Sequence, residues 1–134
     1  MKNTIRLLRN ILQNKIEDRL FNDGIILFND KKYYGAHESW EELWTKHQLE
    51  DDIFIQGLIQ LTVAFFRITN LNLKGSRNLF KKCLPKLKFF PPNHRSLNLS
   101  EIINYAENSY QKVNSIILPD QFNWKLAPKI IKVI

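Results

Sequence analysis

Cysteine is nearly absent from this sequence of 134 residues, and its scarcity limits what the protein can be. Cys83 is the single cysteine, so the chain can form no internal disulfide and no metal cluster built on several thiolates. A metal site would have to come from histidine and carboxylate side chains instead. Such cysteine usage is typical of a reducing compartment, and we therefore expect a cytoplasmic location.

Glycine and proline are also scarce, with four and five residues respectively. No alternation of apolar and polar residues runs long enough to indicate a β-sheet, whereas apolar residues recur at helical spacing through most of the chain. The length fits one domain with a sizeable core. We therefore predict a compact all-α, single-domain bundle of about five to six helices over residues 1–134, with a C-terminal tail at about 118–134.

Long apolar runs are missing as well. The first ten residues carry charge but no apolar stretch of signal-peptide length. The most apolar stretch, Ile53–Ile68, is short for a bilayer span and is interrupted by Gln56, Gln60 and Thr62. We therefore expect no association with a membrane.

The spacing of apolar residues predicts where the helices lie, and two features predict where they break. Asn22–Gly24 is expected to end the first helix, and Pro85 is expected to limit or kink a later one. No internal repeat is visible, and the last five residues are either packed on the body or free. The predicted helices are residues 4–21, 25–28, 33–47, 53–68, 73–84 and 101–117.

The predicted helix at 33–47 contains the best candidate for a functional site. It holds two of the three tryptophans and two of the three histidines. At about 100° per residue, His37 and Glu41 share one face with Trp40 and Trp44. A carboxylate among aromatic side chains needs a partner, because an unpaired charge is costly to bury.

Two interpretations of this face are open. His37 and Glu41, one helical turn apart, could offer an imidazole and a carboxylate to a divalent metal ion, with Glu38 or Gln60 as a further ligand. Metal-assisted hydrolysis would then use Glu38 as the base. Alternatively, Glu41 accepts hydrogen bonds in a buried network with no metal. In both, the polar stripe of the next predicted helix, including Gln56 and Gln60, faces the site.

A second class of function follows from the charge distribution. The net charge is +7, yet residues 21–60 hold eight acidic and three basic side chains, while residues 61–95 hold eight basic and none acidic. With Phe89, Phe90 and His94 nearby, such a surface could hold phosphates and stack bases, or it could be a solvated helix face. The candidate nucleic-acid-binding residues are Arg67, Lys74, Arg77, Lys81, Lys82, Lys86 and Lys88.

Residues 24–82 resemble a known family of bacterial and archaeal proteins. The matching features are Phe28–Asn29, the spacing His-x3-Glu-x2-Trp that begins at His37, the run Gln56–Gln60, and Gly75. This set resembles the family catalogued as "domain of unknown function 309". The resemblance implies a compact helical domain whose motif has been suggested to bind metal, without an established activity.

The sequence departs from that family at three positions. Leu71 stands where a glycine is usual, Ser76 stands where a smaller residue is usual, and Arg67 stands where the family often has a histidine. The last departure removes one metal ligand that the resemblance implies. Binding of nucleic acid or of another protein through residues 67–95, and assembly into a homo-oligomer through exposed aromatic side chains, therefore stand beside metal binding as hypotheses. Whether the protein is an enzyme stays open.

Overall fold

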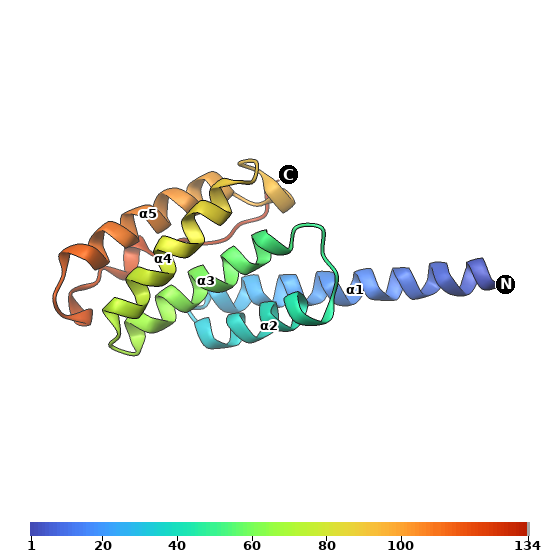
Figure 1. Ribbon diagram of the computed structural model, residues 1–134, viewed down its shortest axis with the longest axis horizontal. Coiled ribbons are helices and arrows are strands. Elements are labelled where there is room, and N and C mark those ends of the chain that lie inside the picture. The colour runs from blue at the N-terminus through green and yellow to red at the C-terminus, as the bar shows by residue number, and fades with distance from the viewer. Residues whose placement is uncertain (134) are drawn as a thin grey trace.

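The computed structural model describes residues 1–133 and has five helices that follow one another along the chain (Figure 1). Within these residues there is no strand, only an isolated antiparallel bridge between Leu97 and Lys132. The predicted all-α fold is confirmed. The helices are α1 (Lys2–Asn29), α2 (Tyr33–Lys46), α3 (Asp52–Thr69), α4 (Leu73–Lys88) and α5 (Leu99–Ser115), with single 3₁₀ turns η1 (His94–Ser96), η2 (Pro119–Gln121) and η3 (Trp124–Leu126).

Each helix packs mainly on its neighbour in the chain, and α3 lies at the centre, between α2 and α4 (Figure 1). Ten of the eighteen residues of α3 are buried. By length and composition alone α3 could cross a membrane, and 56% of it is buried inside the bundle, where its apolar side chains form the core. Gln56 and Gln60 lie on the partly exposed side of α3, so they do not interrupt its buried apolar surface.

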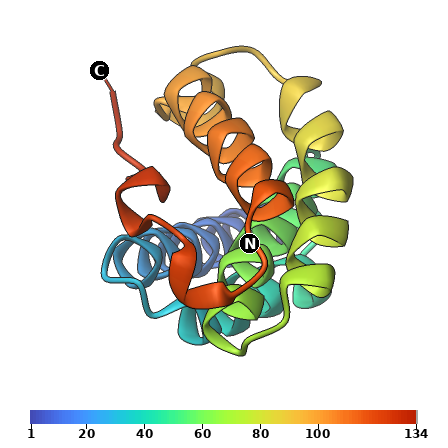
Figure 2. The ribbon, with the colours of Figure 1, turned by 90° about the vertical axis from the view of Figure 1, so that its left-hand side faces the viewer.

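The C-terminal tail packs on the body of the protein. After α5 it crosses the end of the bundle toward α1 (Figure 2). The Trp124 ring stacks on Tyr33 with centroids 6.1 Å apart, and the Asn29 side chain exchanges two hydrogen bonds of 2.8 and 2.7 Å with the backbone of Ile130. Ile130 is 1% exposed. Of the two outcomes left open for the last residues, packing is therefore observed, whereas Ile134 lies outside the described residues.

The turns α1–α2 and α3–α4 have the same geometry, 40 residues apart. Lys31 and Leu71 occupy the left-handed region with φ of 60° and 61°. Lys32 N–H donates to Leu27 and Asn72 N–H donates to Arg67, at 2.9 and 2.8 Å, which closes both helices by the Schellman pattern. A left-handed residue other than glycine costs about 1 kcal/mol, so Lys31 and Leu71 each carry a small conformational cost at these turns.

The repeat extends from these turns into the packing. Residues 33–40 and 73–80 show the same order of buried and exposed positions, with Trp40 and Phe80 fully buried at equivalent places. This repeat is one of backbone geometry and burial, and it does not contradict the prediction that the sequence holds no internal repeat. Among the sixteen pairs from 28–43 and 68–83 only Gly35 and Gly75 are identical, so the similarity lies in the backbone and in burial, not in residue identity. The exposed charges differ in sign, since Glu41 and Glu42 correspond to Lys81 and Lys82.

Two predicted helix ends are wrong, because Gly24 and Pro85, two residues that disfavour helices, are each tolerated inside one. α1 runs without a break through Gly24, which packs against the ring of Trp40. α4 continues past Pro85 to Lys88, since Pro85 is exposed near the end of the helix and removes only one backbone hydrogen bond there.

Candidate functional site

The buried face of α2 consists of four residues, Tyr33, Ala36, Trp40 and Leu43. The centre of this face lies about 80° around the helix from His37, which was predicted to lie near the centre. The side chains of His37 and Glu41 are consequently 32% and 43% exposed. The prediction of a buried site of histidine, glutamate and tryptophan was therefore wrong. His37 and Glu41 lie at the edge of the α2–α3 interface.

The two tryptophans of α2 have different surroundings. Trp40 is fully buried, and its Nε1–H donates to the backbone oxygen of Phe21 at 3.1 Å. Its ring also packs beside Phe28, with centroids 6.1 Å apart. Trp44 is 36% exposed. Trp40 therefore joins α2 to α1 as a core residue, and only Trp44 borders the surface on which His37 and Glu41 lie.

His37 and Glu41 approach each other but gather no further ligand. His37 Nε2 lies 3.7 Å from Glu41 Oε2. Among residues 1–133 no group of three or more histidine, cysteine, aspartate or glutamate side chains comes together as a metal site would require. Since zinc needs three protein ligands in a catalytic site and four in a structural one, this pair supplies half of a structural ligand set. Glu38, the candidate base, is exposed on the outer side of α2.

The polar stripe of α3 has a different partner from the one predicted. The Gln60 Oε1 accepts a hydrogen bond of 2.8 Å from Lys86 Nζ on α4. Gln56 is half-buried on the same side of α3. The stripe thus runs between α2 and α4 along the partly exposed side of the central helix, and Gln60 joins α3 to α4.

A cavity of about 270 Å³ lies between α2 and α3 beside His37. Arg67 at its wall is permanently charged and repels a metal cation, so the wall favours an anionic or aromatic group over a metal. Tyr34 and Phe66 supply aromatic surface, with ring centroids 5.6 Å apart. The lining residues are Tyr34, His37, Val63, Phe66, Arg67 and Asn70.

The predicted basic residues divide into two groups. Three are engaged within the protein: Lys86 with Gln60, Arg77 with the Val113 carbonyl oxygen at 3.3 Å, and Lys88 with Glu107 at 2.5 Å. The others are exposed and form no salt bridge within residues 1–133. This second group consists of Arg67, Lys74, Lys81 and Lys82.

Sequence reasoning missed an ion cluster at one end of the bundle. Arg95 holds Asp51 by two hydrogen bonds, Nε to Oδ2 at 2.6 Å and Nη2 to Oδ1 at 2.8 Å, and His94 Nε2 lies 2.8 Å from Oδ2. The Arg95 guanidinium also lies 4.6 Å from the centre of the Phe21 ring. These residues tie the start of α3 to the turn before α5. The sequence separation of 44 residues left no local signal for this contact.

The cluster predicts a specific loss of stability in acid. Burial acts to raise the pKa of Asp51, but the hydrogen bonds and charges of Arg95 and His94 outweigh it and lower the pKa below its ordinary value of 3.8. The folded state therefore gains stability from Asp51 above about pH 4 and loses it as the pH falls from there through the folded pKa. Urea denaturation at pH 7, 5, 4 and 3 should show the difference between wild type and Asp51→Asn shrinking at the lowest pH values.

The matched control for this prediction is Asp30→Asn, which removes an exposed carboxylate whose only salt bridge is to Lys32. We expect this variant to differ little from wild type at any of the four pH values. A difference between wild type and Asp51→Asn that stays constant from pH 7 to 3 contradicts the prediction.

Two further side chains are more enclosed than their sequence positions suggested. The His47 side chain is 7% exposed and lies 3.4 Å from Glu17 and 2.5 Å from Gln13, so it fastens the end of α2 to α1. Cys83 is fully buried, and burial raises the pKa of its thiol to about 12. A thiol in this state is not a nucleophile at neutral pH.

Comparison with known proteins agrees with this picture of a helical domain without assigned chemistry. The family model described as "Domain of unknown function (DUF309)" matches residues 21–79. An uncharacterized protein of Aquifex aeolicus (strain VF5) is 32% identical over 92 residues, which is 68% of this chain. The chain spans only 28% of the length of that relative. Residues 21–79, which contain α3 and also α2 with its His37–Glu41 pair, therefore belong to the DUF309 family, as the resemblance predicted.

Proposed function

We propose that the protein binds single-stranded nucleic acid along the outward face of α4. The observation that supports this most is a set of exposed lysines, Lys74, Lys81 and Lys82, that form no salt bridge within residues 1–133 and lie on a helix with no acidic residue. Lysines without a carboxylate partner are available to phosphate groups. A lysine that already pairs with a carboxylate would have to break that salt bridge before it could bind a phosphate group.

The three lysines lie on one side of the helix. At about 100° per residue they fall within an arc of about 100°, and the buried residues Phe80 and Leu84 lie outside it. Along the helix axis Lys74 and Lys82 are about 12 Å apart. A phosphate backbone running along α4 can therefore contact all three in turn.

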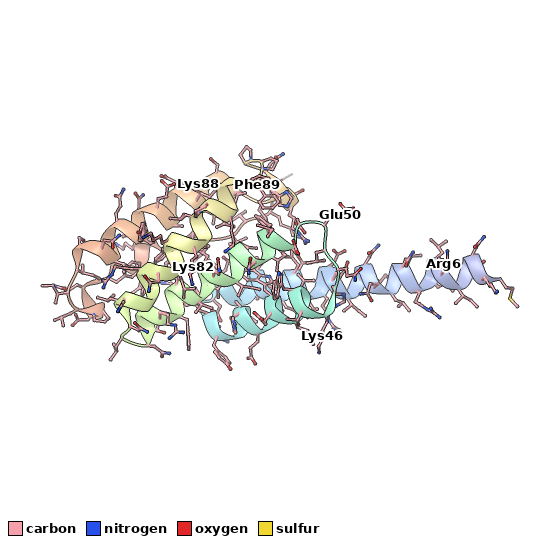
Figure 3. The ribbon with its side chains drawn as sticks, viewed as in Figure 1. Arg6, Lys46, Glu50, Lys82, Lys88 and Phe89 are labelled. Carbon is pink, nitrogen blue, oxygen red and sulfur yellow. The ribbon has the colours of Figure 1, made fainter. Side chains whose placement is uncertain are left out.

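An exposed aromatic side chain stands at one end of this row. Phe89, directly after α4, is 82% exposed, whereas Phe90 packs on Phe54 with ring centroids 5.2 Å apart. Figure 3 shows Lys82 near the middle of α4, with Lys88 and Phe89 at its C-terminal end. Bases of a single strand stack on such rings regardless of sequence, so the surface fits a single strand better than a duplex with its bases enclosed.

The His37–Glu41 pair supports metal binding or metal-assisted hydrolysis less well. Both need a third ligand, which the described residues do not bring to the pair, and Arg67 places a positive charge beside it. The cavity at Arg67 instead suits a base or a phosphate next to the α4 row.

Fluorescence anisotropy with a labelled oligouridine of about 20 nucleotides tests the proposal at several salt concentrations. Combining Lys81→Glu with Lys82→Glu should weaken binding at least tenfold, and the slope of log K against log salt should fall by about 1.4 for two lost contacts to a single strand. The matched control is Lys125→Glu with Lys132→Glu, which changes the net charge equally at exposed positions outside α4.

The control pair should weaken binding by less than threefold. An equal loss in both double variants would mean that net charge alone attracts the nucleic acid, and the α4 site would then be abandoned. Absence of binding by the wild type at 50 mM salt would contradict the proposal outright.

A further inference from the structure

The first half of α1 extends out of the bundle into solvent (Figure 1). Every residue from 1 to 16 is exposed, and Leu20 is the first buried residue of the helix. Within this segment only Gln13 has a side-chain hydrogen bond to the body, to His47. A packing partner would stabilise this exposed segment, because most helical stability in proteins comes from the packing of an amphipathic face.

This segment is rich in exposed apolar side chains. Ile5, Leu8, Leu12 and Ile16 follow at intervals of three and four residues and therefore lie on one side of the helix. Their exposed fractions are 53, 56, 61 and 41%, and Ile11 beside them is 43% exposed. Such a stripe on a single helix is typical of a surface that packs against another helix.

We propose that this stripe pairs with the same stripe of a second copy of the chain, in antiparallel orientation, with the two-fold axis close to Leu12. The contact is self-complementary, as a two-fold interface must be. Leu12 then lies near Leu12 of the partner subunit, and Leu8 lies near Ile16 of the partner subunit.

The charges of the helix select the antiparallel orientation. Lys2, Arg6 and Arg9 lie in the outer part, where no acidic residue occurs, and the first acidic residues are Glu17 and Asp18. A parallel pair would place each arginine beside its own copy, which is repulsive. The antiparallel pair keeps the two basic outer parts apart, because each then lies beside residues 15–19 of the partner subunit, whose two basic and two acidic side chains cancel. Figure 3 shows Arg6 on the extended part of α1, clear of the bundle.

The available area is sufficient for a dimer. The apolar stripe of one copy exposes a few hundred Å² of apolar surface to water, which is comparable with the largest apolar patch of a typical monomer. Two copies with their polar rims reach the roughly 1,000 Å² that a specific interface requires.

The mass in solution tests the proposal with the full chain. Light scattering coupled to gel filtration should give about twice 16.0 kDa for the wild type. Combining Leu8→Glu with Leu12→Glu should reduce the mass to that of a monomer, while the bundle stays folded because both positions are exposed. The matched control is Leu71→Glu with Ile117→Glu, at positions 77 and 86% exposed outside α1, and it should remain dimeric.

Cysteine cross-linking tests the orientation separately, and the native Cys83 does not interfere because it is buried. Leu12→Cys, near the axis, should form a disulfide-linked dimer on mild oxidation, whereas Ile5→Cys should not. Cross-linking of both variants would indicate a parallel pair and overturn the orientation. A monomeric wild type at 100 µM would overturn the dimer, and so would a dimer that survives Leu8→Glu with Leu12→Glu. A monomer that binds phosphatidylglycerol vesicles only with the stripe intact would assign the stripe to a membrane instead.

Discussion

Replacing Trp40 with alanine is expected to lower the free energy of unfolding by about 3 to 5 kcal/mol, the largest effect of any single substitution considered for this protein. The side chain is fully buried, so its removal leaves a cavity between α1 and α2 and takes away the hydrogen bond to the Phe21 oxygen. Urea denaturation followed by circular dichroism at 222 nm measures the change.

The matched control is Trp44→Ala, the same chemical change on the same helix at a residue that is 36% exposed. We expect it to cost about 1 kcal/mol or less, because the site is already open to water. Equal losses in the two variants would contradict the assignment of Trp40 to the core and of Trp44 to the surface.

Replacing Gly24 with alanine should destabilise the protein by about 2 to 3 kcal/mol, although alanine favours helices over glycine by about 1 kcal/mol. A Cβ at this position would lie 2.1 Å from Trp40 Nε1 and 2.3 Å from Cε2. The indole is enclosed and cannot move away. Gly35→Ala is the control, since its Cβ would lie 3.3 Å from the flexible end of Leu27, and it should be neutral or slightly stabilising.

A double-mutant cycle identifies the cause of the Gly24 effect. Trp40→Ala removes the indole that the new methyl group would meet, so Gly24→Ala should cost clearly less in that background than in the wild type. Additive effects would show that the Trp40 ring is not the obstacle. The unfolding midpoint in urea again provides the measurement.

Helix positions followed from the sequence because apolar spacing reports local geometry, and α2, α3 and α5 lie close to their predicted ranges. Of the two ends that failed, the one at Gly24 depended on a tertiary contact. Gly24 sits inside α1 because of Trp40, which is sixteen residues away and on another helix. Local helix propensity favours a break there by only about 1 kcal/mol, so one well-packed ring decides the outcome.

The candidate site was predicted less well, for a related reason. Periodicity showed that α2 has an aromatic side, but it could not show which part of that side faces α1 and α3. Tyr33 and Trp40 turned out to be central, and His37 and Glu41 lie at the edge. Contacts such as Arg95 with Asp51, and Lys86 with Gln60, join residues that are 44 and 26 positions apart in the sequence and leave no local pattern.

The repeated helix pairs give the molecule an electrical polarity. α2 and α4 occupy equivalent places on either side of α3, and at corresponding positions one has Glu41 and Glu42 where the other has Lys81 and Lys82. The field of such a pair reaches about 8 Å at physiological salt, so it acts on a charged partner only over the last steps of approach. Within that distance a polyanion is turned so that it meets α4 first, and a polycation so that it meets α2.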